Sequence, residues 1–261
     1  MRSKYGPWAV VTGASEGIGR EFALRLAERG VDLVLVARRR ELLEALARTL
    51  PVATKVVAAD LATPEGVARA IAACDGLEVG LLVAAAGFGT SGRFVDGDVA
   101  RELAMVDVNC RAVAALAHHF GGRFARQRRG GIVLMSSLVA FQGVPRASNY
   151  AATKAYVQSL AEGLRVELAP FGVDVVSSAP GPIRSGFERA AGMRMGMAGT
   201  PASVAAGTLG ALGRKGTVRP GWLSKLLEWS LALLPRWGRV RMMGVVMGGM
   251  TKHQALTGRG A

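Results

Sequence analysis

Tyr150 and Lys154 are four residues apart at the start of a predicted helix, so the phenol and the ammonium share one face of it. A nearby cation favours the phenolate and lowers the pKa of a tyrosine from about 10 toward the working pH. A tyrosine tuned in this way can give or take a proton during a reaction. Such pairs also occur on ordinary surface helices, so the spacing alone leaves a purely structural role open.

Ser137 lies shortly before that helix, at the end of a predicted buried strand. Ligands of parallel α/β sheets bind beyond the carboxyl ends of the strands. A hydroxyl at this position could therefore hydrogen-bond a substrate oxygen. The positions of Ser137, Tyr150 and Lys154 are thus compatible with one proton-transfer site, and the spacing alone leaves a structural role open.

A glycine-rich turn near the amino terminus follows a short apolar stretch, residues 8–11. Its sequence is Thr12-Gly13-Ala14-Ser15-Glu16-Gly17-Ile18-Gly19, and a helical pattern then runs to Arg29. Glycine lets the backbone turn tightly and approach a ligand, and the amino end of a helix attracts phosphate oxygens. An ordinary tight turn is the alternative, but its position between a strand and a helix favours a nucleotide site.

The second predicted strand ends in a basic cluster, where Arg38 and Arg39 follow Ala37. NAD-binding sites usually place an acid at the end of this strand, on the ribose 2′-hydroxyl, and residues 33–40 contain none. A guanidinium group instead grips a 2′-phosphate. We predict NADP(H) as the cofactor, with NAD(H) as the alternative and solvated loop arginines as the structural explanation.

Apolar stretches and helical patterns alternate along the chain. The predicted strands cover residues 8–11, 33–37, 55–60, 81–87, 131–137, 173–177 and 216–218. The predicted helices cover residues 18–29, 41–50, 64–74, 99–126, 148–169 and 201–212. Strands that are apolar along their whole length indicate a parallel sheet covered on both faces. We predict an α/β protein, a single-domain Rossmann fold with a doubly wound parallel sheet of about seven strands.

From Val10 to about Ser185 the chain resembles the short-chain dehydrogenase/reductase family. Five signals occur in the family's order: the glycine turn, Asp60-Leu61, Ala86-Gly87, the Ser137/Tyr150/Lys154 set and Pro180-Gly181-Pro182-Ile183.

This resemblance implies roles for four catalytic residues. Tyr150 protonates a carbonyl oxygen as hydride arrives from the nicotinamide, and Ser137 fixes that oxygen. Lys154 lowers the pKa of Tyr150 and bonds the nicotinamide ribose. Asn109, within the predicted helix 99–126, holds a water that passes protons to Lys154; a helix asparagine bonded to its own backbone is the alternative.

The resemblance and the charge argument together give a predicted cofactor-binding set. Its members are Gly13, Ser15, Gly17, Ile18, Gly19, Arg38, Arg39, Asp60, Leu61, Ala86, Gly87, Asn109, Tyr150, Lys154, Pro180, Gly181, Ile183 and Ser185.

The sequence departs from the family's pattern at three places. Ala84-Ala85-Ala86-Gly87 replaces the common Asn-Asn-Ala-Gly, which predicts lower affinity or local rigidity. Glu16 stands where many NADP-preferring members carry a basic residue, and Ser185 replaces a threonine but keeps the hydroxyl.

Length and composition favour one folded domain over residues 1–261, with 50% hydrophobic residues and a net charge of +14. Cys74, Cys110 and the three histidines lack metal-ligand spacing, so we expect reduced thiols and no metal. The sequence has no signal-peptide pattern and no apolar stretch of about 18 residues. We predict a cytoplasmic protein, with peripheral contact at a membrane surface as a further expectation.

The carboxyl-terminal third is basic, since Glu228 is the only acid after Glu188. Residues 185–212 are a predicted substrate lid, and residues 222–261 are a predicted leucine-rich extension like that of bacterial family members with longer C-termini. The stretch 222–234 places leucines on one helical stripe, and Arg236, Trp237, Arg239 and Arg241 follow it. Core or dimer packing explains the stripe, and a membrane-surface helix is the alternative.

Four explanations of the positive charge stay open. In order of preference, they are an arginine-rich solvated surface, an anionic membrane, a phosphate-bearing substrate and nucleic acid. The sequence contains no recognisable nucleic-acid module, so we expect no specific nucleic-acid partner.

The predicted function is an NADP(H)-dependent oxidoreductase that interconverts a ketone and a secondary alcohol. The lid carries Phe187, Met193, Met195 and Met197, which suits a lipid, acyl or sterol-like substrate. The alternative is a non-catalytic NADP-binding regulatory module, against which the intact serine, tyrosine and lysine argue. Related enzymes pair through the two long helices, which implies a homodimer or homotetramer.

Overall fold

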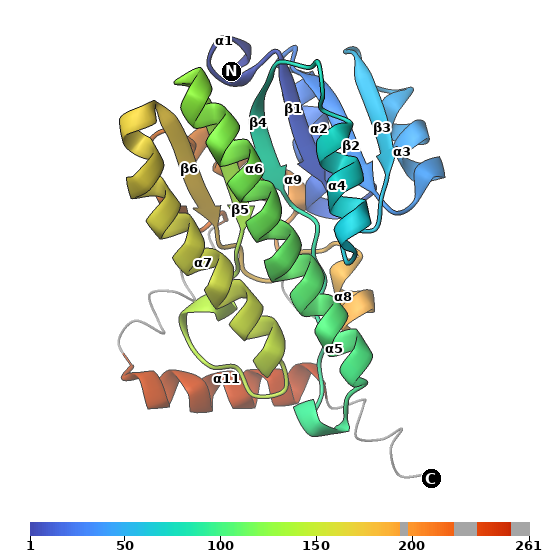
Figure 1. Cartoon of the computed structure of the whole chain (residues 1–261). Helices are drawn as coiled ribbons and strands as arrows, with labels where there is room; N and C mark the ends of the chain where they lie inside the picture. The colour runs from blue at the N-terminus through green and yellow to red at the C-terminus, as the bar shows by residue number, and fades with distance from the viewer. Residues whose placement is uncertain (194–197, 222–233, 252–261) are drawn as a thin grey trace.

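A seven-stranded sheet forms the centre of the molecule, described here by a computed structural model over residues 1–193, 198–221 and 234–251 (Figure 1). The strands are β1 (Trp8–Thr12), β2 (Asp32–Ala37), β3 (Thr54–Ala58), β4 (Val79–Ala84), β5 (Gly130–Met135), β6 (Val173–Ser178) and β7 (Thr217–Val218). All paired strands are parallel, in the order β3-β2-β1-β4-β5-β6-β7. The predicted fold class is confirmed, and the order reverses between β1 and β4, where such sheets bind ligands.

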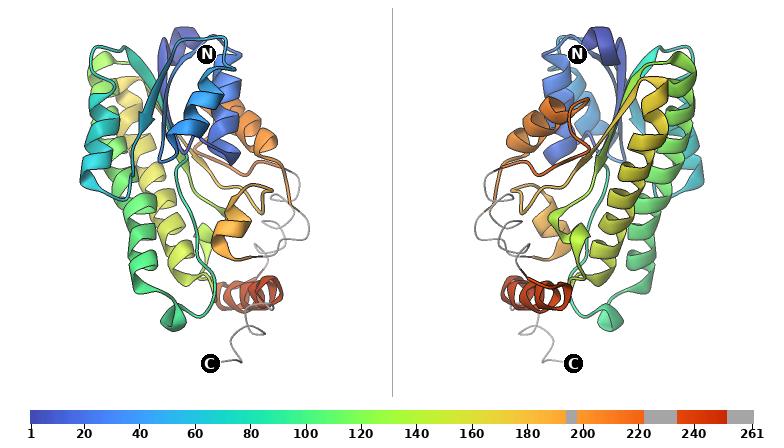
Figure 2. Two further views of the ribbon diagram at one scale, coloured as in Figure 1. Left: turned by 90° about the vertical axis from the view of Figure 1, so that its right-hand side faces the viewer. Right: turned by 90° about the vertical axis from the view of Figure 1, so that its left-hand side faces the viewer.

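Helices cover both faces of this sheet (Figures 1 and 2). One face is covered by α2 (Gly17–Ala27), α3 (Arg40–Ala47) and α9 (Pro201–Ala211), and the other by α4 (Pro64–Ala72), α6 (Ala112–Gln127) and α7 (Ser148–Leu168). The other helices and helical turns within the described residues are α1 (Arg2–Tyr5), η1 (Phe94–Asp96), α5 (Val99–Val106), η2 (Asp107–Arg111), η3 (Leu138–Phe141), η4 (Ala169–Phe171), α8 (Phe187–Ala191) and α11 (Arg236–Met250).

The central strands are buried on both sides, which is why their sequences are apolar without alternation. Val10 of β1 pairs with Val34 and Leu82, and all three face the layer of α4, α6 and α7. The next residue, Val11, faces the opposite layer together with its own strand partners. Successive side chains therefore pack into two separate apolar cores, one on each face of the sheet, as the two-residue period of a strand requires.

The predicted helix 99–126 is interrupted in the structure, so its prediction as one helix is wrong. Between α5 and α6 the chain forms η2, a π-helical turn that contains Asn109. The Asn109 side chain is fully buried. A π turn accommodates one extra residue per turn and is common at functional sites.

The structure narrows the predicted lid of residues 185–212. Helix α9 packs against α2 and buries Val204 and Leu209 in the core, so it belongs to the covered sheet. Only the part before α9 can act as a lid, and that role stays a prediction. Among the residues that the structure describes, no helix is long and apolar enough to cross a membrane. The predicted leucine stripe lies almost entirely in residues 222–233, outside the described residues.

Candidate active site

A cavity of about 860 Å³ opens at the carboxyl ends of the strands. Its walls come from the glycine turn, the ends of β2 to β5, the start of α7, the segment after β6 and the helix α11. Every residue of the predicted catalytic and cofactor-binding sets lines this cavity except Asn109. The structure therefore brings together side chains that are far apart in the sequence.

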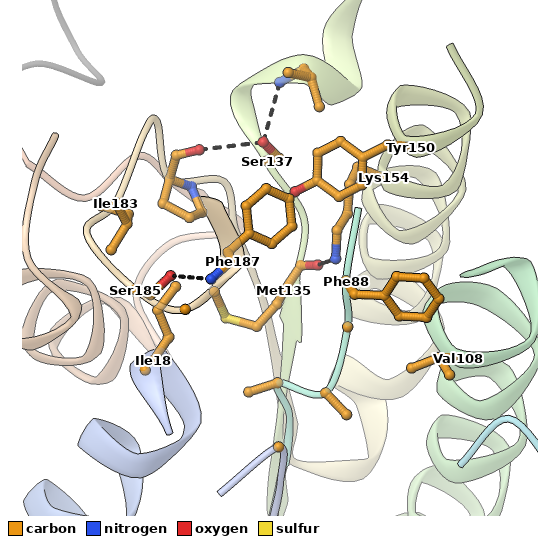
Figure 3. Close-up of a pocket in the computed structure, with 18 of the residues that line it drawn as sticks. Ile18, Phe88, Val108, Met135, Ser137, Tyr150, Lys154, Ile183, Ser185 and Phe187 are labelled. Carbon is orange, nitrogen blue, oxygen red and sulfur yellow. Dashed lines mark hydrogen bonds between the residues drawn. The ribbon is translucent and has the colours of Figure 1, made fainter. Parts of the chain in front are cut away.

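Ser137, Tyr150 and Lys154 converge in this cavity (Figure 3). Ser137 is the second residue after the end of β5, and its hydroxyl is hydrogen-bonded to Tyr150. It also lies 3.5 Å from the Pro180 carbonyl oxygen, to which it donates. Tyr150 and Lys154 come from one face of α7, and the Lys154 Nζ atom lies 5.8 Å from the centre of the tyrosine ring.

Burial dominates the proton affinities of both side chains in the described chain. It raises the pKa of Tyr150 to about 12, and the smaller opposing effect is the hydrogen bond from Ser137. It lowers the pKa of Lys154 to about 8. The prediction that the lysine pulls the tyrosine pKa down is therefore wrong for this state, because desolvation penalises both charged forms.

The Lys154 ammonium is held by the backbone. Its Nζ atom donates to the Met135 carbonyl oxygen at 2.9 Å, and the side chain is 7% exposed. The Ser136 hydroxyl in turn donates to the Lys154 carbonyl oxygen at 3.0 Å. These bonds join α7 to the end of β5, so the position of the lysine is set by the sheet itself.

Asn109 lies behind the cavity wall and joins two of its elements. Its amide nitrogen donates to the Phe88 carbonyl oxygen at 2.9 Å and to the Thr153 hydroxyl at 3.1 Å. Its Oδ1 atom accepts from the Phe88 N–H at 3.2 Å. A Cβ on Gly87 would lie 2.9 Å from that Oδ1 atom and 3.4 Å from Lys154 Nζ, so glycine is needed for this close approach.

The glycine turn lines the cavity beside these residues. Gly13 and Gly17 have positive φ angles of 69° and 58°, a region that glycine adopts easily. A Cβ on Gly19 would lie only 2.3 Å from the Gly13 carbonyl oxygen. Glu16, the N-cap residue of α2, makes no side-chain hydrogen bond to the backbone of that helix. The first N–H groups of α2 therefore suit a dinucleotide phosphate.

Arg39 lies beside this turn at the rim of the cavity. Its Nη2 atom is 2.9 Å from Glu16 Oε2 and 3.2 Å from the Ser15 hydroxyl oxygen. Both members of the ion pair are about half exposed, with side-chain exposures of 50% and 51%. Glu16, one of the three departures from the family's pattern, is thus the acid that Arg39 contacts.

The other two departures also have structural counterparts. Ala84 and Ala85 provide no side-chain amides, but the Thr12 hydroxyl accepts from the Ala86 N–H at 3.0 Å and lies 3.5 Å from the Val83 carbonyl oxygen. Threonine therefore supplies a link between β1 and the chain after β4. The Ser185 hydroxyl accepts from the Phe187 N–H at 3.4 Å, at the start of α8.

Sequence reasoning missed the wall formed by α11. This helix lines the cavity with Met242, Met243, Val246, Met247 and Met250. The spacing of Met243, Met247 and Met250 is the signal that could have found it.

Of the predicted lid residues, Phe187 and Met193 line the cavity, whereas Met195 and Met197 lie outside the described residues. The Phe187 ring packs over Tyr150, with ring centres 5.2 Å apart. Within the described part of the chain, no cluster of three or more His, Cys, Asp or Glu could hold a metal ion.

Residues 7–194 match the family described as short chain dehydrogenase. The 7beta-hydroxysteroid dehydrogenase of Clostridium sardiniense is 37% identical over 180 residues, covering 67% of this chain and 69% of that protein. The very-long-chain 3-oxoacyl-CoA reductase of Podospora anserina is 37% identical over 184 residues, covering 66% and 53%.

Solved structures agree with these sequence matches. A 7beta-hydroxysteroid dehydrogenase structure superposes with a TM-score of 0.85 at 29% identity, covering 93% of this chain and 98% of that one. A short-chain dehydrogenase from Sphingobium yanoikuyae, in complex with NADPH, gives a TM-score of 0.78 at 30% identity, with coverages of 88% and 97%. The sheet, the shared cavity and these matches lead to one conclusion: this chain belongs to the short-chain dehydrogenase family and is an oxidoreductase.

Proposed function

We propose that this oxidoreductase uses NADP(H) to interconvert a ketone and a secondary alcohol on a bulky apolar substrate. The observation that carries the proposal is the convergence of Ser137, Tyr150 and Lys154 in a cavity that also contains the glycine turn. A proton donor and a dinucleotide cradle in one cavity are the two parts that such a reaction needs.

In the proposed reduction, the Tyr150 phenol gives its proton to the carbonyl oxygen of the ketone. Its raised pKa keeps that proton in place at neutral pH before substrate arrives. The Ser137 hydroxyl, which is bonded to the phenol, orients the same oxygen. Lys154 would hold the nicotinamide ribose and place a positive charge beside the phenol. The nicotinamide, when bound, supplies the hydride.

Asn109 is proposed as a positioning residue. Its side-chain hydrogen bonds go to Phe88 and Thr153, and Thr153 directly precedes Lys154. The residue thus fixes the loop after β4 against α7. The water that the family resemblance assigns to Asn109 stays a prediction.

Charge at the rim supports NADP(H) over NAD(H). Arg38 and Arg39 line the cavity at the end of β2, and no acid from that strand end stands beside them. A 2′-phosphate would compete with Glu16 for the Arg39 guanidinium. The NADPH complex of the Sphingobium yanoikuyae relative fits this choice.

The walls of the cavity support an apolar substrate. Methionine, valine and phenylalanine side chains from α8 and α11 face the space beyond Tyr150. Flexible methionines suit a large ring system or an acyl chain. The hydroxysteroid dehydrogenase and the 3-oxoacyl-CoA reductase named above match a lipid, acyl or sterol-like substrate.

Mixing the protein with NADPH or NADH and a panel of ketones tests this function. We expect loss of nicotinamide absorbance with NADPH and bulky apolar ketones, and slower loss with NADH. NADPH binding without turnover of any ketone would instead favour the regulatory-module alternative. No binding of either cofactor would contradict the proposal entirely.

We propose that the chain assembles as a homodimer or homotetramer through α5 and α7, which contact each other. Their outer surfaces carry Val99, Leu103, Tyr156 and Val166 with exposures of 43% to 75%. Light scattering of wild type and Leu103→Glu tests this, with a lower mass expected for the variant. The cytoplasmic location stays a prediction.

A further inference from the structure

Helix α11 has one face toward the cavity and one face toward the outside. Its inward residue Met247 is 4% exposed and packs with Val144 and Ala147. The outward side chains are apolar as well: Trp237 is 67% exposed and Val245 is 78% exposed. An outward helix face in a water-soluble protein usually carries charges of both signs.

The charges on this helix are all positive. Arg236, Arg239 and Arg241 belong to α11, which contains no acid, and no Asp or Glu follows Glu228 in the sequence. Arg241 lies over the Trp237 ring, with its guanidinium carbon 5.7 Å from the ring centre. Tryptophan with nearby arginines is the composition of helices that lie on anionic membrane surfaces.

A second exposed apolar group lies at the same end of the molecule. Phe94 and Val95 in η1 are 56% and 85% exposed. The segment before η1 is tied to the end of α11 through Arg146, which accepts from the Gly92 N–H and donates to Thr251. Figures 1 and 2 show α11 and the turn before α5 at the end of the molecule opposite α1.

We propose that α11 and η1 together form a docking surface for a lipid bilayer that contains anionic lipid. Trp237, Val245, Phe94 and Val95 would enter the interface, and Arg236 and Arg241 would contact lipid phosphates. The arginines add electrostatic attraction to anionic lipid, and the buried apolar side chains add hydrophobic affinity. Helix α11 carries three arginines and no acid, and the acid of η1, Asp96, is paired with Arg93. The positive charge of α11 favours lipid over a second copy of the chain, whose own α11 would repel it.

The location of this surface also indicates the class of substrate, an inference that rests on the proposed function. Met242 and Val246 line the cavity, are 40% and 42% exposed, and belong to α11, the helix that also carries Trp237 and Val245. The docking surface therefore borders the cavity itself. A membrane-dissolved ketone could reach Tyr150 along α11 without crossing bulk water, which assigns the substrate to lipids that partition into bilayers.

Sedimentation with vesicles tests the docking directly, and needs neither cofactor nor substrate. Full-length protein is mixed with vesicles of phosphatidylcholine alone or with added phosphatidylserine. The variants are Trp237→Ser with Val245→Ser, and Arg236→Gln with Arg241→Gln. The control, Leu42→Ser with Arg48→Gln, changes an exposed leucine and an arginine on α3 and the turn after it, on another side of the molecule.

We expect wild type and control to sediment with phosphatidylserine vesicles and not with phosphatidylcholine alone. The arginine variant should bind roughly 30-fold more weakly, from about 1 kcal/mol for each arginine. All four proteins should reduce a water-soluble ketone at similar rates, because none of the changed residues lines the cavity. Loss of turnover in every protein would thus bear on the proposed function and leave the vesicle result intact.

Three outcomes would overturn the docking surface. Wild type could fail to sediment with anionic vesicles, or the Trp237/Val245 variant could bind them as tightly as wild type. The same variant could also shift the mass measured by light scattering from dimer to monomer, which would make this face an interface between two copies.

Discussion

Two walls of one cavity hold their side chains in different ways. The wall formed by β5 and α7 uses hydrogen bonds to the backbone, such as Lys154 to Met135 and Ser136 to Lys154. The wall formed by α11 uses apolar contacts, such as those of Met247 with Val144. The first wall fixes atoms where chemistry requires them, whereas the second tolerates side chains that adapt to a substrate.

This difference predicts that substitutions in the two walls will change different kinetic parameters. Changes in the hydrogen-bonded wall should lower the rate of the chemical step with little change in substrate affinity. Changes in the methionine wall should alter KM for bulky substrates and leave small ones unaffected. A substitution in one wall that changed both the rate of the chemical step and KM for bulky substrates would weaken this distinction between the walls.

The largest expected effect is that of Lys154→Met, which removes the cation from the hydrogen-bonded wall. We expect kcat to fall by about 10²- to 10⁴-fold, the range of a lost acid–base component. Steady-state kinetics with NADPH and a reactive ketone measure it. Lys215→Met, at an exposed position, serves as the matched control and should keep its activity.

The same residue predicts how stability depends on pH. The folded-state pKa of Lys154 is about 8, below its ordinary 10.5, so between these values the unfolded chain binds more protons. The free energy of unfolding should therefore gain about 3 kcal/mol from this residue as pH rises through that window. Urea unfolding at several pH values measures the gain, which should be absent from Lys154→Met.

Met247→Ala tests the apolar wall. Removing this buried side chain should cost about 2 kcal/mol in the free energy of unfolding and raise KM for bulky ketones severalfold. KM for a small ketone and for NADPH should stay unchanged. Val245→Ala, two residues away on the outward face, provides the control; an equal KM change there would remove the distinction between the two faces of α11.

The most selective expected effect concerns the cofactor rim, because it should appear with one cofactor and not with the other. Arg39→Gln should raise KM for NADPH about 10-fold and leave KM for NADH unchanged, because one charge-assisted contact to the 2′-phosphate is lost. Glu16→Gln should lower KM for NADPH severalfold by freeing Arg39. Arg40→Gln is the control, since Arg40 does not line the cavity. Equal responses to both cofactors would argue against a 2′-phosphate site.

The hydrogen-bonded wall could be predicted from sequence because its strands and helices have recognisable local patterns that follow one another along the chain. Buried strands are apolar throughout, and their carboxyl ends place Ser137 and Gly87 at one edge. The π turn around Asn109 could not be predicted, since its neighbours read as continuous helix. The predicted direction of the pKa shift of Tyr150 was wrong, because sequence spacing reveals a nearby cation but not how deeply the phenol is buried.

Helix α11 was missed for a different reason. It contains Gly238, Gly244, Gly248 and Gly249, and each glycine lowers helix propensity by about 1 kcal/mol. Its stability comes from packing against residues such as Val144 and Ala147, which are distant in sequence. The pattern of Met243, Met247 and Met250 indicates an apolar face but not the cavity that it covers.

A single-turnover experiment with Tyr150→Phe tests the central claim most directly. Protein saturated with NADPH is mixed with a bulky ketone, and nicotinamide absorbance is followed; Tyr156→Phe, on the exposed side of the same helix, is the control. We predict that Tyr150→Phe keeps the NADPH-induced rise in Tm and oxidises NADPH at least about 100-fold more slowly than wild type and control. Equal rates in all three proteins would contradict proton transfer by Tyr150 and the function built on it.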